Sequence, residues 1–164
     1  MPDRAALLTA LGPILDALAE VDPADPTLAA ALNRRLPVDG EALSAVASLV
    51  RAGAEAGWLA PKGEPGMRFG RVSKALPETR DFAVDAVDME GPGPPHTHPR
   101  GELNLCFALD GSPTFDGQPP GWVVLGPGSW HVPTVAGGRM AILYFLPGGA
   151  WQSGPALAPA GERG

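Results

Sequence analysis

The sequence has little of several residue types that many functions require. It contains one cysteine, Cys106, which excludes an intramolecular disulfide and gives no sign of an oxidising compartment. Twelve lysines and arginines stand against 18 acidic residues, and the net charge of −6 argues against nucleic acid and anionic membranes as partners. No stretch approaches the roughly 20 apolar residues of a membrane span. The leucine-rich N-terminus carries Asp3, Asp16 and Glu20 and has no cleavage pattern, so we expect a soluble, cytoplasmic protein.

Histidine is also scarce, but all three histidines stand in informative positions. His96 and His98 lie two residues apart in a Pro-rich segment, and side chains alternate along an extended chain, so both imidazoles should share one face. Glu102 follows after a Pro-Arg-Gly bend that can return it to that face, and His131 follows a tight Gly-Pro-Gly turn. A His-x-His pair can arise by accident. Three imidazoles and a carboxylate, gathered at two places where a turn leads into an extended segment, favour a metal site. We predict a divalent ion, Zn, Fe, Mn or Ni, at these four residues.

The N-terminal third predicts helices. Leucines recur at three- and four-residue spacing before Asp22, with Pro13 as a kink or early stop. Asp25 is the predicted N-cap of a second, short helix, and Gly57 is the predicted stop of a third. The predicted helices span residues 4–20, 26–35 and 40–55.

From Trp58 onward the pattern changes to short alternating runs separated by Gly, Pro and Asp, which predicts an antiparallel sandwich or small barrel. The predicted strands are Met67–Ala75, Phe82–Met89, Glu102–Leu109, Trp122–Leu125 and Arg139–Leu146. A chain of 164 residues suits one full core. We therefore expect a helical segment (1–60) packed on a β-barrel (61–152), followed by a frayed tail (153–164).

The strand that begins at Glu102 has two unlike faces. Its small and polar side, with Asn104 and Cys106, should line a cavity for a small ligand if Glu102 binds metal. Cys106 itself is expected to be a small buried hydrophobe rather than a nucleophile. The bulky side must then be covered by the N-terminal helices or by a second subunit, and a homodimer is the expected assembly.

Residues 91–135 resemble the two signature motifs of the cupin superfamily. The motif residues are His96, His98 and Glu102, and then Gly121, Pro127, Gly128 and His131. The glycine usually found beyond the glutamate is displaced to Gly111, and the last residue of the second motif is Val135 instead of Asn. The resemblance implies a mainly β cupin fold, a small antiparallel barrel or jelly roll, here with an N-terminal α-helical segment.

A narrower resemblance covers about residues 28–151. Its motifs are Ala-Gly-Trp (56–58), Arg-Phe-x-Arg-Val (68–72), His-x-His-Pro-x-Gly-Glu-x-Asn (96–104), Gly-Pro-Gly-Ser-x-His-x-Pro (126–133) and Leu-Tyr-Phe-Leu-Pro-x-Gly (143–149). In these the chain is similar to the 4-hydroxylaminobenzoate lyase family of cupins, whose members form 3,4-dihydroxybenzoate and release ammonia. In that family a His often stands where this chain has Trp130, and an aromatic residue where it has Arg100.

The resemblance implies a metal-dependent lyase whose substrate is a small aromatic carboxylate. Glu102 and His131 are the expected catalytic residues. The expected substrate-binding residues are Arg100, Arg68, Arg71, Asn104 and Trp130. For each arginine the alternative is a solvated surface residue. Two other functions use the same ligands: an Fe(II)-dependent cupin dioxygenase, which would consume oxygen, and a cupin that binds a small molecule without turnover.

Overall fold

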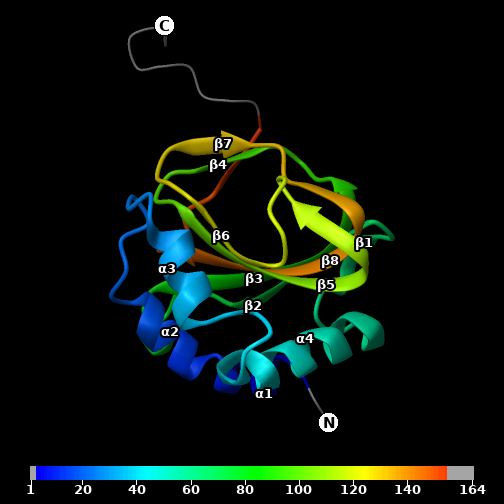
Figure 1. Cartoon of the computed structure of the whole chain (residues 1–164), viewed down its shortest axis with the longest axis horizontal. Coiled ribbons are helices and arrows are strands. Elements are labelled where there is room, and N and C mark those ends of the chain that lie inside the picture. Colours follow the sequence, from blue (N-terminus) through cyan, green and yellow to red (C-terminus); the bar gives the residue numbers. More distant parts are fainter. Residues whose placement is uncertain (1–2, 155–164) are drawn as a thin grey trace, which may run out of the picture.

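Residues 3–154 are described by a computed structural model in which helices cover one face of a β-sandwich. Figure 1 shows the helices along one side of the molecule and the strands β4 and β7 on the opposite side. The helices are α1 (Arg4–Ala10), α2 (Gly12–Leu18), α3 (Leu28–Arg35), α4 (Ser44–Ala56) and the short 3-10 turns Glu41–Leu43 and Pro77–Thr79. The strands are β1 (Lys62–Glu64), β2 (Met67–Ser73), β3 (Phe82–Pro92), β4 (His96–His98), β5 (Glu102–Phe115), β6 (Gly121–Leu125), β7 (Ser129–His131), β8 (Thr134–Pro147) and β9 (Gln152–Ser153).

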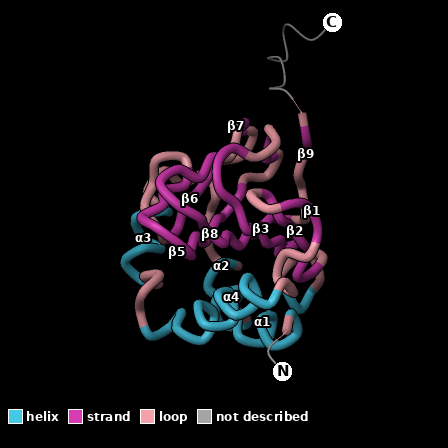
Figure 2. Tube along the Cα trace, turned by 90° about the vertical axis from the view of Figure 1, so that its right-hand side faces the viewer, coloured by secondary structure: helices cyan, strands magenta, loops and turns pink. Residues whose placement is uncertain are grey.

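The strands form two antiparallel sheets. The large sheet has the order β1-β2-β3-β8-β5-β6, and the small sheet has the order β7-β4-β9. Figure 2 shows the helices on one side of the large sheet, while β7 and β9 lie on the other side. The large sheet therefore has a helix-covered outer face and an inner face turned toward the small sheet.

The two faces of the large sheet bury separate apolar cores. The outer core joins Leu103, Leu105 and Phe107 of β5 to leucines and valines of the helices, among them Leu7 and Val50. The inner core contains Cys106, Phe115, Val123, Met140, Ile142 and Tyr144, together with other residues of β3 and β8. The N-terminal helices thus cover the bulky face of β5. Of the two predicted covers, the helices and a second subunit, the helices are the one observed.

Helix positions agree with the sequence in outline and differ in detail. The helical run broken at Pro13 is confirmed, because α1 ends at Ala10 and Pro13 lies in the first turn of α2. Gly57 ends α4 with a φ of 87°, as predicted. The prediction that Asp25 caps the second helix is wrong. Its carboxylate instead accepts hydrogen bonds from Thr27 N and Oγ1, both at 2.8 Å, which forms a local turn and delays the helix to Leu28.

The predicted fold class, mainly β with an N-terminal helical segment, is confirmed. All five predicted strands are present, but the sequence missed β1, β4, β7 and β9, which have two or three residues each. The division of the chain near residue 60 stays a prediction, and most of the predicted tail, residues 155–164, lies outside the described residues. Within residues 3–154 no helix is long and apolar enough to cross a membrane.

Candidate metal centre and pocket

Four predicted ligands come together between the two sheets. His96 and His98 are the ends of β4, and its antiparallel pairing with β7 places His96 opposite His131. Glu102 begins β5 and therefore comes from the large sheet. The three imidazoles thus belong to the small sheet and the carboxylate belongs to the large one, so packing of the two sheets assembles the cluster.

Two glycine turns make this approach possible. Gly101 has a φ of 88°, and a Cβ there would lie 2.9 Å from Pro23 Cβ and 3.1 Å from Leu125 O, so the bend before Glu102 requires glycine. Gly128 has a φ of 81° and turns the chain into β7. The backbone N–H groups of both glycines donate to His98 O, at 3.2 Å and 2.7 Å. One carbonyl on β4 therefore holds both turns that deliver the other two ligands.

Three of the four side chains are buried, His131 is partly buried, and all four converge through one atom each. Their ligand atoms lie within 4.8 Å of one another. Glu102 Oε2 is 2.7 Å from His98 Nε2, 3.7 Å from His96 Nε2 and 3.8 Å from His131 Nε2. His96 Nε2 and His131 Nε2 are 3.0 Å apart. His96, His98 and Glu102 are at most 2% exposed, whereas the side chain of His131 is 11% exposed, so His131 is the most accessible of the four.

The outer nitrogen of each imidazole has its own partner. His96 Nδ1 lies 3.2 Å from Pro94 O, and His98 Nδ1 lies 3.0 Å from Ser129 Oγ, which donates to Gly126 O at 2.6 Å. His131 Nδ1 lies 2.5 Å from Asp116 Oδ2. A partner at Nδ1 fixes the ring and leaves Nε2 to bind a metal, which is the usual arrangement around protein-bound metals.

Electrostatics and unpaired atoms in the cluster also fit a cation. Burial raises the pKa of Glu102, but the His96 and His98 imidazoles outweigh burial and lower its pKa to about 2, so the group is a carboxylate. Asn104 Nδ2 donates to Glu102 Oε2 at 3.3 Å. Among the described residues, the buried Glu102 Oε1 has no hydrogen-bond partner, and His98 Nε2, although 2.7 Å from Glu102 Oε2, makes no well-aligned hydrogen bond. Unpaired buried donors and acceptors are costly, and a bound divalent ion would satisfy them.

A pocket of about 610 Å³ adjoins the cluster at His96. Apolar and aromatic side chains form most of its wall. The lining includes Phe69, Tyr144 and Trp151, together with the charged pair Arg71 and Asp85. Trp151 lies over His96 with ring centroids 5.3 Å apart and is 44% exposed, so it stands where the pocket meets solvent. A pocket of this size and lining suits a small aromatic ligand.

The predicted substrate-binding residues are placed unevenly. Arg71 lines the pocket, and Asn104 is buried beside Glu102. Arg68 does not line it. Arg100 is 57% exposed, with its Nη1 3.7 Å from Asp81 Oδ2. Trp130 is 40% exposed, and its indole N–H donates to Gly154 O at 3.0 Å.

Sequence reasoning missed three residues of this region. Asp116 precedes Gly117, a pair that reads as an ordinary hairpin turn, and only the fold carries it to His131. Tyr144 lies in the motif at residues 143–149 that resembles the family, but the motif alone predicts no binding or catalytic role for it. Trp151 lies in the Gly-rich segment after β8, whose composition carried no signal of a pocket wall.

Comparisons with known proteins agree on one family. The sequence model of the family described as PnbB: 4-hydroxylaminobenzoate lyase matches residues 12–152. A 4-hydroxylaminobenzoate lyase of Pseudomonas putida is 32% identical over 136 residues, which cover 72% of this chain and 77% of the relative. Another, from Nocardioides sp. (strain LMS-CY), is 34% identical over 128 residues, which cover 72% and 76%.

Among solved structures, recombinant oxalate oxidase in complex with glycolate aligns at 19% sequence identity with a TM-score of 0.22. The alignment covers 56% of this chain and 51% of that protein, so the chain spans about half of its length.

Proposed function

This chain belongs to the 4-hydroxylaminobenzoate lyase family, and we propose that it converts 4-hydroxylaminobenzoate and water into 3,4-dihydroxybenzoate and ammonia. The observation that carries the proposal is the combination of family membership with a buried three-histidine, one-glutamate cluster beside an apolar pocket. Membership supports the substrate, and the cluster supports a site of chemistry rather than a binding module.

A divalent metal would be held by Nε2 of the three histidines and by the Glu102 carboxylate. Zn, Fe, Mn and Ni all accept this set of ligands. When bound, such an ion polarises an oxygen or nitrogen of the substrate or lowers the pKa of a bound water toward neutrality. We assign the holding or moving of a proton to Glu102 and His131. His96 and His98 would only bind and orient.

The pocket suggests one orientation for the substrate. Arg71 donates to Asp85 through Nε and Nη2, at 2.7 and 3.1 Å, and its Nη1 makes no hydrogen bond to any described residue. That nitrogen is available for the substrate carboxylate. The hydroxylamine group stands para to the carboxylate, so it would point away from Arg71 and toward His96. The ring between them would pack on the apolar wall.

The overall reaction balances without an external oxidant. The N–O bond breaks with its electron pair on oxygen, which takes a proton and leaves as water. One water then adds to ring carbon 3 and gives up a proton, which restores the proton taken by the leaving oxygen. A second water hydrolyses the carbon–nitrogen double bond at carbon 4, ammonia departs, and a proton shift restores the aromatic ring. One water is consumed in total.

The test is turnover of 4-hydroxylaminobenzoate by purified protein reconstituted with each candidate metal. Ammonia and 3,4-dihydroxybenzoate should appear in equal amounts, should be lost with a chelator, and should return when metal is restored. Product without metal would refute the metal's role and keep the lyase. No product from metal-loaded protein would refute the lyase, and oxygen uptake with a catechol would favour the dioxygenase instead.

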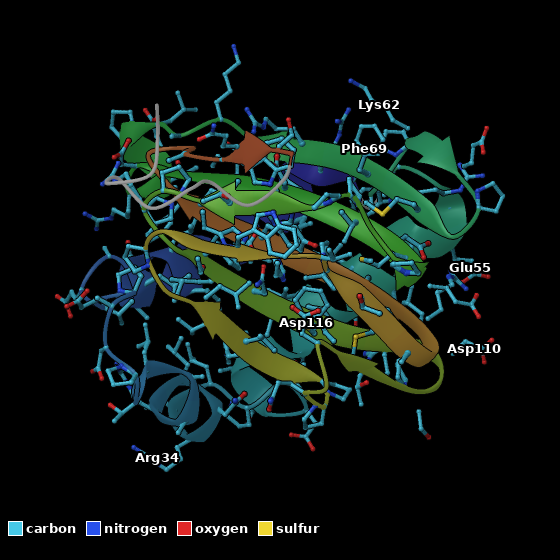
Figure 3. All side chains as sticks on the ribbon, turned by 90° about the horizontal axis from the view of Figure 1, so that it is seen from above. Arg34, Glu55, Lys62, Phe69, Asp110 and Asp116 are labelled. Carbon is cyan, nitrogen blue, oxygen red and sulfur yellow. The ribbon has the colours of Figure 1, made fainter. Side chains whose placement is uncertain are left out.

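The orientation has its own test in Arg71→Gln. If Nη1 binds the carboxylate, KM should rise about tenfold or more, since a hydrogen bond to a charged group contributes about 1.5–3 kcal/mol, while kcat changes little. The matched control is Arg34→Gln, an exposed arginine on α3 far from Lys62 and Phe69 at the pocket rim (Figure 3). An unchanged KM would show that Arg71 does not bind the substrate.

A homodimer and a cytoplasmic location are also proposed. Light scattering during size-exclusion chromatography tests the dimer.

A further inference from the structure

A row of polar side chains crosses the inner face of the large sheet. Arg71 on β2 pairs in register with Asp85 on β3, Asp85 pairs with Tyr144 on β8, and Tyr144 pairs with Asn104 on β5. Neighbouring strands are about 4.8 Å apart, so the row extends over about 14 Å. It begins at the arginine proposed to bind the carboxylate and ends at the amide that donates to Glu102. Tyr144 is the member next to the metal end.

Two members of this row have a polar atom without a partner among residues 3–154, Asn104 through Oδ1 and Tyr144 through its hydroxyl, and Tyr144 is the one that lines the pocket. Arg71 and Asp85 bond to each other, and Asn104 donates to Glu102. The phenol is only 6% exposed and makes no hydrogen bond to any residue in the range 3–154. Tyr144 lines the pocket together with His96, and their ring centroids are 6.4 Å apart, so a ligand there can supply the partner.

We propose that Tyr144 is a further catalytic residue, whose phenol donates a hydrogen bond to the hydroxylamine oxygen of the substrate. This inference rests on the proposed lyase function. A substrate with its carboxylate at Arg71 lies along the row and presents its para substituent to the Tyr144 end. When the N–O bond breaks, its electron pair moves to that oxygen, and a fixed donor stabilises the charge that develops there.

Tyr144 can act as a donor that is held in place. A tyrosine hydroxyl carries its proton at neutral pH and can therefore donate it to a hydrogen bond. Its ring is held by the inner core, with Phe115 6.5 Å away between centroids. The hydroxyl position is therefore set by packing before the substrate arrives, which is what a donor aimed at a developing charge requires.

The test is Tyr144→Phe in metal-loaded protein, a change that removes one oxygen atom. We expect kcat to fall about 10²–10³-fold, as when one such donor is removed elsewhere, with metal content unchanged and KM within about threefold. The control is Met140→Leu, on the same strand and in the same core but outside the pocket lining, which should keep kcat.

A second measurement separates chemistry from pocket shape. 4-Aminobenzoate has the same ring and carboxylate but no hydroxylamine oxygen, so its dissociation constant should be the same for wild type and Tyr144→Phe. A wild-type kcat in the variant would overturn the inference, and so would a loss of kcat matched by weaker 4-aminobenzoate binding. Absence of turnover in the wild type would instead refute the lyase function, and this inference with it.

Discussion

Replacing Asp116 by asparagine should weaken metal binding through the tautomer of His131. The Asp116 carboxylate has two fixed partners: Oδ1 accepts the backbone N–H of Thr134 at 2.9 Å, and Oδ2 lies 2.5 Å from His131 Nδ1. In Asp116→Asn the Thr134 N–H still requires an oxygen, so the new NH2 group must face His131. Nδ1 must then accept, which moves the ring proton to Nε2, the atom that points into the cluster.

The size of the effect follows from what this contact does. Loss of an outer partner of a metal-binding histidine costs about ten- to hundredfold in metal affinity, or about 1.4–2.7 kcal/mol. Asp116→Asn should cause a loss of metal affinity near the upper end of this range, because it places a proton on His131 Nε2, the atom that would bind the metal. Asp116→Ala only removes the partner of Nδ1 and leaves His131 free to adopt either tautomer. We therefore expect affinities in the order wild type, Asp116→Ala, Asp116→Asn, although asparagine is closer in shape to aspartate.

The assay is competition for Zn²⁺ against a chelator of known affinity, with thermal unfolding of each metal-free variant as a check on folding. Asp110→Asn is the matched control, because Asp110 is an exposed acid near the rim of the molecule, while Asp116 lies toward its centre (Figure 3). Wild-type affinity in Asp116→Asn would refute the tautomer argument. Equal losses in the alanine and asparagine variants would reduce Asp116 to a simple hydrogen-bond partner.

Three further outcomes are expected from other parts of the fold. Cys106 is fully buried, and burial raises the pKa of its thiol well above the usual value. A thiol reagent at pH 8 should therefore modify Cys106 only after the protein is unfolded in urea. Rapid modification of the native protein would contradict this. Phe107→Ala should lower the free energy of unfolding by about 3–5 kcal/mol in urea titrations, and Leu109→Ala, on the same face but partly exposed, should lower it clearly less. Trp151→Ala should raise KM about two- to twelvefold, from loss of an aromatic contact, whereas Leu76→Ala, also an exposed apolar residue but outside the pocket, should not.

The sequence was most informative where chemistry depends on local geometry. The two-residue spacing of His96 and His98 places their side chains on one face of any extended segment, and both side chains are buried at the cluster. The Pro-Arg-Gly bend returns Glu102 because Gly101 adopts a positive φ, which is a local property of glycine. The alternation along β5 likewise separated the cavity side from the side that needed a cover. Each inference required only a few consecutive residues.

The missed features depend on contacts between distant segments. β4 and β7 have three residues each, too few for a pattern, and their pairing is defined only once the turn at Gly128 is in place. Asp116 reaches His131 from 15 positions away, through the end of a long strand. The start of α3 was misjudged for a local reason, because the carboxylate of Asp25 bonds to Thr27 within a turn instead of capping a helix that starts beside it. A capping signal and a turn signal share the same residue types.

The same alternation along β5 explains why the chain can carry such a polar centre. Every second side chain, Leu103, Leu105 and Phe107, is buried against the helices and contributes apolar burial to stability. The residues between them, Glu102 and Asn104, contribute buried polar atoms, some of which have no partner among the described residues. A strand that stabilises the fold on one face can therefore hold an unfavourable arrangement on the other. The site therefore depends on the helical segment. Without the helices, the apolar face of β5 would be exposed to water, while its polar face would still hold unpaired buried atoms.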